Sequence, residues 1–205
     1  MPTDELRRFL TALGADRIPH AGGSLLDHLT RTSERLASWG ADDDVQTIAM
    51  AHACYGTDGF ADYLPTLDQR DDLRAVVGPQ VEAEVYRYAS CGRTRTYPHL
   101  SDRPDIVFHD RFADTETAIP AHDLRPFAAL TVANELDVYL HLDDPGETFR
   151  TWLLDLAGQL RDLLPTLAWP DCTTALGTPS PCSPAPHDAP TPVLRSPEGV
   201  HPRVT

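Results

Sequence analysis

The stretch that decides the fold covers residues 28 to 60 and reads HLTRTSERLASWGADDDVQTIAMAHACYGTDGF. Its apolar residues recur every three or four positions on both sides of Gly40, which is the pattern of two amphipathic helices. Ser24 is placed to cap the first helix, with Asp27 three residues later as in a capping box. The acidic run at 42–44 suits the first turn of the second helix, where carboxylates interact favourably with the helix dipole. We therefore predict two antiparallel helices joined by a short turn.

Helical periodicity extends over most of the remaining chain, whereas residues 90–120 have a different pattern. That segment has few long apolar runs, and the residue types in Arg93–Tyr97 and Ile106–Phe112 alternate, which favours a small β-ribbon. The sequence predicts an all-α bundle of six or seven helices with a small β-ribbon insertion. Besides the central pair, the expected helices span residues 4–13, 68–77, 80–89, 127–141 and 147–164.

The end of the chain differs from the rest in composition. Nine of the 19 prolines lie between Pro170 and Pro202, and this part lacks a hydrophobic pattern that could offset the entropy of the chain. We expect one helical domain over residues 1–168, followed by a proline-rich disordered tail over residues 169–205.

The formal net charge of −14 bears on partners, because a strongly negative protein repels phosphate backbones and anionic lipid. Nucleic acid and membrane surfaces are therefore not expected as partners, and a small molecule is. The N-terminus has no apolar leader, and no window of 18 residues is continuously apolar, so the expected location is the cytoplasm. The oligomeric state stays open.

Three polar residues fall on apolar helix faces: His28, His52 and Asn134. A single residue of this kind is most often a satisfied core residue. Each of the three would cost about 1–3 kcal/mol to bury without a partner, so three on separate helices favour one shared polar cluster. A spacing of 24 residues between the two histidines suits two antiparallel helices. We expect all three side chains to line a common interior space.

The same residues carry a resemblance to a known family. Residues 28–60 resemble the opening of the HD superfamily, a metal-dependent phosphohydrolase fold. The likeness is closest to uncharacterised HD-like domains with an H-x-x-YGT motif, here beginning at His52, and more distant to the stringent-response nucleotide hydrolases. VANELDVYLHL, residues 132–142, resembles the helix that supplies the last metal ligand of the superfamily. The resemblance covers roughly Ser24 to His141.

The resemblance implies a metal site and also shows what that site has lost. His28 matches the first ligand, His52 the histidine of the HD doublet, and Asn134 the final aspartate. Ala53 stands where the doublet has its aspartate, so both carboxylates are gone. A divalent ion such as Mn, Fe or Zn would bind weakly to two imidazoles and an amide, which argues against a bound metal. Candidate replacement ligands are Asp58, Glu82, Glu135, Asp137, His99 and His109.

Without a metal, His28 and His52 remain candidates for general acid–base catalysis, because free imidazole titrates near neutral pH. Further catalytic candidates are Tyr55, Thr57 and Asp58 in the turn after His52; the alternative is a tight turn that needs Gly56. Candidate substrate-binding residues are Glu82, Arg93, Arg95 and Arg111. For Glu82 the alternative is a solvated helix face, and for the arginines it is structural ion pairing.

These observations lead to three hypotheses about function. The first is a diverged HD-like enzyme that acts on a small phosphorylated or nucleotide-like metabolite in a His-lined pocket between helices, with hydrolysis as its default reaction. The second is an HD-like iron oxygenase, or a metal-free lyase or isomerase. The third is a binding or scaffold protein that has lost the metal site. A serine nucleophile motif, a P-loop and a dinucleotide-binding fingerprint are missing from the sequence.

Overall fold

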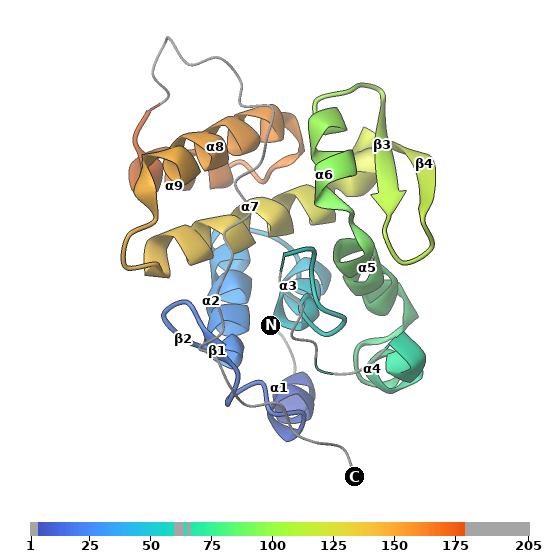
Figure 1. The fold of residues 1–205 in the computed structure, drawn as a ribbon. Coiled ribbons are helices and arrows are strands. Elements are labelled where there is room, and N and C mark those ends of the chain that lie inside the picture. The colour runs from blue at the N-terminus through green and yellow to red at the C-terminus, as the bar shows by residue number, and fades with distance from the viewer. Residues whose placement is uncertain (1–3, 60–63, 65–66, 179–205) are drawn as a thin grey trace.

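The computed structural model describes residues 4–59, 64 and 67–178, and this part of the chain folds mainly into helices. The elements surround helix α7 (Arg125–His141), which crosses the middle of the molecule (Figure 1). Helices α2 (Leu25–Ser38), α3 (Asp43–Ala51) and α5 (Pro79–Ser90) lie on one side of α7. Helices α8 (Gly146–Gln159) and α9 (Ala168–Leu176) lie on the other. The predicted all-α class with a small β insertion is confirmed.

The remaining elements are shorter. Helix α1 packs against α3 and α4, and α4 packs against α5 (Figure 1). The described residues contain nine α-helices instead of the six or seven expected, because the short α6 and the late α9 were not predicted as helices. The remaining bounds are α1 Asp4–Ala12, β1 Pro19–His20, β2 Gly23–Ser24, α4 Arg70–Val77, α6 Arg93–Thr96, β3 Asp105–Asp110 and β4 Thr115–Pro120.

The α2–α3 pair forms as its sequence predicts. The Ser24 hydroxyl accepts a hydrogen bond from the Asp27 backbone N–H at 3.2 Å, and the Asp27 carboxylate accepts from the Ser24 backbone at 2.9 Å. This reciprocal capping box begins α2. Gly40 adopts a φ of +83°, which glycine reaches without strain, and so ends the helix. Asp42 then caps α3 through a 2.9 Å bond from the Val45 backbone.

Helix α7 is buried on almost its whole circumference, since every residue from Phe127 to Val138 is buried. The expected picture was an amphipathic helix with one apolar stripe. A helix enclosed by neighbours on all sides needs no polar face, and α7 packs against α2, α5 and α8. Its polar residues Asn134, Glu135 and Asp137 therefore lie in the interior, where each needs a partner.

The expected β-ribbon is the antiparallel pair β3–β4, in which Ile106 lies opposite Ile119. The alternating segment Arg93–Tyr97 is not part of the ribbon, however. It forms helix α6, which begins after Gly92 and bonds the Thr96 N–H to the Gly92 carbonyl at 2.9 Å. Alternation over only five residues does not distinguish a strand from a single helical turn.

Helix α9 corrects the predicted start of the tail at residue 169. Its face at Ala168, Cys172 and Leu176 is buried at helical spacing. Asp171 accepts hydrogen bonds from Arg35 Nη1 at 2.5 Å and from Trp39 Nε1 at 2.9 Å, which fastens α9 to α2. The high proline content led to a predicted start of the tail that is too early in the sequence. The rest of the predicted tail, from residue 179 onward, lies outside the described residues.

A search of the described residues for a helix long and apolar enough to cross a membrane finds none.

Candidate functional site

The three polar residues singled out by the sequence meet in the interior. The side chains of His28 and His52 are 1 % and 2 % exposed, and their ring centroids lie 5.3 Å apart in an edge-to-face arrangement. Oδ1 of Asn134 lies 3.0 Å from Nε2 of His28. Helices α2 and α7 and the end of α3 therefore bring two imidazoles and one carboxamide together, as expected.

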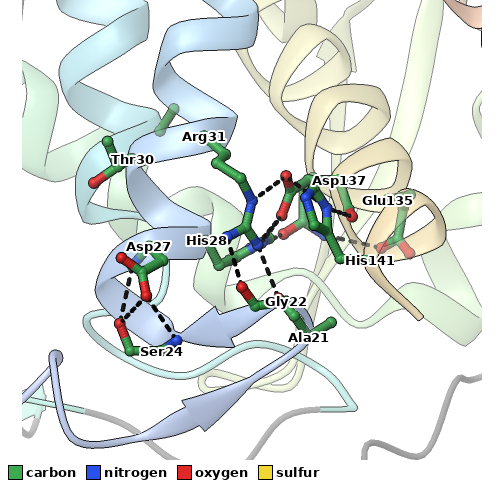
Figure 2. Close-up of polar contacts among 12 residues, drawn as sticks. Ala21, Gly22, Ser24, Asp27, His28, Thr30, Arg31, Glu135, Asp137 and His141 are labelled. Atoms are coloured by element: carbon green, nitrogen blue, oxygen red, sulfur yellow. Dashed lines mark hydrogen bonds and ion pairs between the residues drawn. The ribbon is translucent and has the colours of Figure 1, made fainter. Parts of the chain in front are cut away.

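The second ring nitrogen of His28 faces a carboxylate that the sequence analysis considered only as a replacement ligand. Nδ1 of His28 lies 2.7 Å from Oδ2 of Asp137, whose side chain is fully buried. Arg31, one turn after His28, donates to both oxygens of the same carboxylate at 2.8 and 2.9 Å (Figure 2). Burial alone would raise the pKa of Asp137, but hydrogen bonds from His28 and Arg31 lower it to about 2.

The orientation of Asn134 determines the charge of His28. Its Nδ2 donates to Oε1 of Glu135 at 3.1 Å, and the same oxygen accepts from Arg93 Nη1 at 2.8 Å. An ionised carboxylate only accepts, so the amide nitrogen must face Glu135 and the amide oxygen must face His28. Both ring nitrogens of His28 then face acceptors. This arrangement suits an imidazolium, in which both nitrogens carry a proton.

His52 has the opposite character. Its Nδ1 lies 2.7 Å from the backbone oxygen of Ala49, which can only accept, so this nitrogen carries the proton. Burial, together with the charge on His28, lowers the pKa of His52 to about 3. The imidazole is therefore neutral at physiological pH, and its Nε2 has a lone pair and no proton. The neutral imidazole of His52 and the His28 ring, which faces two acceptors, lie in direct ring contact.

A hairpin made of β1 and β2 packs over this pair, and the sequence analysis gave it no role. His20 stacks on His28 with ring centroids 4.1 Å apart, and burial followed by the charge on His28 lowers the pKa of His20 to about 3. Arg31 donates to the Ala21 and Gly22 carbonyls at 2.8 and 3.3 Å, as Figure 2 shows. Gly22 has a φ of +72°, and a Cβ there would lie 2.5 Å from the His141 ring.

Arg31 and His20 were missed by the sequence analysis for different reasons. Arg31 lies three residues after His28 and Asp137 three residues after Asn134, so helical spacing places each beside a recognised site residue. That spacing was an available signal. His20 lies in a loop, and its stack on His28 follows from how the hairpin folds back, which no periodicity reveals.

Tyr55 and Glu82 lie together in a separate cluster. The Tyr55 hydroxyl donates to Oε1 of Glu82 at 3.0 Å, and Arg70 and Arg74 donate to the same carboxylate at 2.6 to 3.0 Å. Burial alone would raise the pKa of Glu82, but these hydrogen bonds lower it. Glu82 is fully buried, so the alternative of a solvated helix face is wrong. The structure thus gives Tyr55, a catalytic candidate, a carboxylate partner on α5.

Asp58 and Thr57 occupy the turn after His52. Asp58 Oδ2 accepts from the Arg93 backbone N–H at 2.8 Å, so this carboxylate caps the start of α6. Thr57 is half-buried in the same turn. Gly56 has a φ of +69°, which agrees with the tight-turn interpretation of this motif.

The three candidate anion-binding arginines do not share a site. Arg93 binds Glu135 inside the core. Arg95 is half-exposed and pairs with acidic residues of the β3–β4 hairpin, Asp114 at 3.1 Å and Glu116 at 2.6 Å. Arg111 donates to the Ala89 carbonyl at 2.9 Å, and its guanidinium lies over the Phe112 ring. Arg93 alone belongs to the network around the histidines.

The donors at the family position do not fit a metal ion. Both nitrogens of His28 are already bonded to side chains of α7, the Asn134 oxygen faces His28, and His52 offers one lone pair. Each candidate replacement ligand is already bonded: Asp58 to Arg93, Glu82 to Arg70, Glu135 to Arg93, Asp137 to Arg31, His99 to Asp102 and His109 to Asp114. Across the described part of the chain, no group of three or more His, Cys, Asp or Glu side chains could hold a metal ion.

Comparison with known proteins gives one match. A family model described as a domain of unknown function (DUF6817) matches residues 9–93. This segment contains His20, His28, Arg31 and His52, while Asn134 and Asp137 on α7 lie outside it. No curated protein and no solved structure matches the chain.

Proposed function

We propose that this chain is a metal-independent enzyme of HD-like ancestry, which performs acid–base chemistry on a small phosphorylated or nucleotide-like metabolite at the His28–His52 pair. One observation carries the proposal. The His52 ring, whose Nδ1 is bonded to the Ala49 carbonyl, lies 5.3 Å, ring to ring, from His28, whose two ring nitrogens both face acceptors, Asp137 and Asn134. In this proposal His52 accepts a proton as general base, and a protonated His28 stabilises negative charge that develops in the transition state.

Hydrolysis is the reaction to test first. In this reaction His52 Nε2 accepts a proton from water, and the water oxygen forms a bond to phosphorus. The bond between phosphorus and the leaving oxygen breaks, and His52 passes its proton to that oxygen. The positive charge of His28 stabilises negative charge that develops on the phosphoryl group. No proton remains on the enzyme at the end of the cycle.

The low pKa of His52 belongs to the protein without a ligand. The charge on His28 contributes to it, and a bound phosphoryl group brings negative charge to the same place. A nearby anion favours the protonated form of an imidazole. Ligand binding therefore raises the pKa of His52 toward the neutral range in which a general base is most effective.

A binding or scaffold role is the competing candidate, and one observation favours it. Both ring nitrogens of His28 are satisfied within the protein, as they would be in a purely structural polar core. The iron oxygenase hypothesis has less support, because the donor set does not fit a metal. Turnover distinguishes an enzyme from a binding protein, and a chelator distinguishes metal-dependent from metal-independent turnover.

The test is hydrolysis of p-nitrophenyl phosphate and of a panel of nucleoside monophosphates, with and without EDTA. We expect turnover that EDTA does not change, and a loss of about 100-fold or more in His52→Gln. The matched control is His99→Gln, because His99 is an exposed histidine paired with Asp102 and should leave turnover unchanged. Turnover abolished by EDTA, or unaffected in His52→Gln, contradicts the proposal. Ligand binding without turnover supports the scaffold alternative.

A further inference from the structure

Tyr88 on α5 is a buried residue to which neither the sequence nor the acid–base pair assigns a role. Its side chain is 4 % exposed, and its ring meets the His52 ring edge to face with centroids 5.3 Å apart. Among the described residues, no acceptor takes the proton of its hydroxyl. Burial raises the pKa of this hydroxyl, so it keeps its proton and is a donor.

An unpaired hydroxyl in this position is unfavourable for folding, and a phenylalanine ring would fill the same space without it. The neighbouring tyrosine on the same helix shows the ordinary arrangement. Tyr86 donates its hydroxyl proton to Asp110 Oδ2 at 3.1 Å. Tyr88 therefore has a donor available for a molecule that the protein itself does not supply.

The groups around Tyr88 indicate which kind of molecule could accept the proton of its hydroxyl. Arg93 acts on the Tyr88 hydroxyl as a positive charge and as a hydrogen-bond donor, and Glu135 acts on it as a negative charge. The charge of Glu135 is already met by Arg93 and Asn134. His28, whose ring also contacts the His52 ring, adds a positive charge. His52 Nε2 can accept a proton, and Tyr88 can donate one. A ligand that complements these side chains is an anion with both a hydroxyl and an unprotonated oxygen. Hydrogen phosphate is such an anion.

We propose that Tyr88 is a further ligand-binding residue, whose hydroxyl donates to an unprotonated oxygen of a phosphoryl group while a P–OH group of the same ligand donates to His52. This inference rests on the proposed function, because it places the phosphoryl group of the proposed substrate or product beside the same histidine. It adds a residue from α5 to a site otherwise built from α2, α7 and the end of α3.

The experiment measures binding of inorganic phosphate at pH 7 by calorimetry, with the full-length protein and the variants Tyr88→Phe and Tyr86→Phe. Sulfate is the matched ligand, because it has the same shape and no proton to donate at this pH. A nucleoside monophosphate and its parent nucleoside distinguish a phosphate ester from a free phosphate. Thermal unfolding of each variant is recorded alongside.

We expect phosphate to bind the wild-type protein more tightly than sulfate does, and Tyr88→Phe to weaken phosphate binding about tenfold or more. Tyr88→Phe should melt at the same or a higher temperature than wild type. Tyr86→Phe should show the reverse pattern, with unchanged phosphate affinity and a lower melting temperature, because it loses a bond to Asp110. A structural role for Tyr88 cannot produce this opposition between affinity and stability.

Equal phosphate affinity in Tyr88→Phe and wild type overturns the inference, as does a wild-type protein that binds no phosphate or binds sulfate equally well. The hydrolysis assay separates this failure from that of the proposed function. If His52→Gln abolishes turnover while Tyr88→Phe leaves both turnover and phosphate affinity intact, the acid–base proposal stands and the role of Tyr88 is wrong.

Discussion

Nδ1 of His28 lies 2.7 Å from Oδ2 of Asp137, although the two residues are separated by 109 positions in the sequence. The same carboxylate receives two hydrogen bonds from Arg31, which also binds the carbonyls of the β1–β2 hairpin. One buried aspartate therefore joins α2, α7 and the hairpin. It lies against Nδ1 of His28, while Asn134, also on α7, lies against Nε2.

Replacing Asp137 by Asn should destabilise the fold strongly. The variant removes the negative charge between Arg31 and His28 while keeping the shape of the side chain. Loss of one partner from a buried ion pair costs about 3 kcal/mol or more. Chemical denaturation in urea measures the change. Asp144→Asn, an exposed acid shortly after α7, is the control, and an equal effect in both variants would contradict the account.

The stability of the protein should fall as the pH drops below about 6.5, and His52 is one cause. Its pKa is lowered from 6.5 in the unfolded chain to about 3 in the fold. Between pH 6.5 and about 3, His52 binds a proton in the unfolded chain but not in the folded protein. The free energy of unfolding is therefore highest above pH 6.5 and decreases as the pH falls below it. Each pH unit in this window costs about 1.4 kcal/mol for one histidine.

Urea unfolding midpoints between pH 7 and pH 4.5 measure this dependence. The His52→Gln variant should lose stability with acid less steeply than wild type by about 1.4 kcal/mol per pH unit. Asp137 does not affect this comparison, because its pKa is lowered to about 2. Its contribution to the free energy of unfolding is therefore lost mainly at more acidic pH. Parallel pH profiles for wild type and His52→Gln would show that His52 is not held neutral.

Glu82→Gln should destabilise the second cluster without affecting the histidine site. Glu82 is buried and bonded to Tyr55, Arg70 and Arg74, and the two arginines are partly exposed. Solvent around the arginines reduces the cost below that of a fully buried pair, to about 2 kcal/mol. Glu147→Gln breaks an exposed pair with Arg150 and should change stability little. Equal unfolding midpoints for the two variants would refute this assignment.

The fold class and the three central residues of the candidate site could be predicted from sequence, because both depend on local periodicity. Capping residues at Ser24 and Asp42 and polar residues on apolar faces are visible in the sequence, and they led to His28, His52 and Asn134. Partners across the fold could not be predicted in the same way. That Tyr55 pairs with Glu82, and Arg93 with Glu135, depends on how the helices pack.

The predicted end of the helical domain was wrong because the prediction relied on proline content and did not use the short amphipathic pattern of α9. Pro170 lies in the first turn of α9, where a missing N–H breaks no helical bond. Proline therefore signals a helix start here instead of a disordered segment. Ala168, Cys172 and Leu176 are spaced four residues apart and are buried on one face of α9. This spacing was visible in the sequence and indicated a helix.

Truncation tests the corrected boundary. A chain that ends at residue 178 keeps α9 and should retain the melting temperature of the full-length protein. A chain that ends at residue 167 loses the bonds from Arg35 and Trp39 to Asp171 and exposes the apolar surface that α9 covers. We expect the shorter chain to melt at a lower temperature or to aggregate. Equal thermal stability of the two chains would place the end of the domain before α9.

The protonation of the two central histidines tests the account most directly. Nitrogen NMR of histidine-labelled protein at pH 7, assigned through His28→Gln and His52→Gln, reports which ring nitrogens carry protons. We expect His28 to have protons on both nitrogens, and His52 to have a proton on Nδ1 and none on Nε2. A neutral His28, or a His52 protonated at Nε2, would contradict an acid–base pair made of one charged and one neutral imidazole.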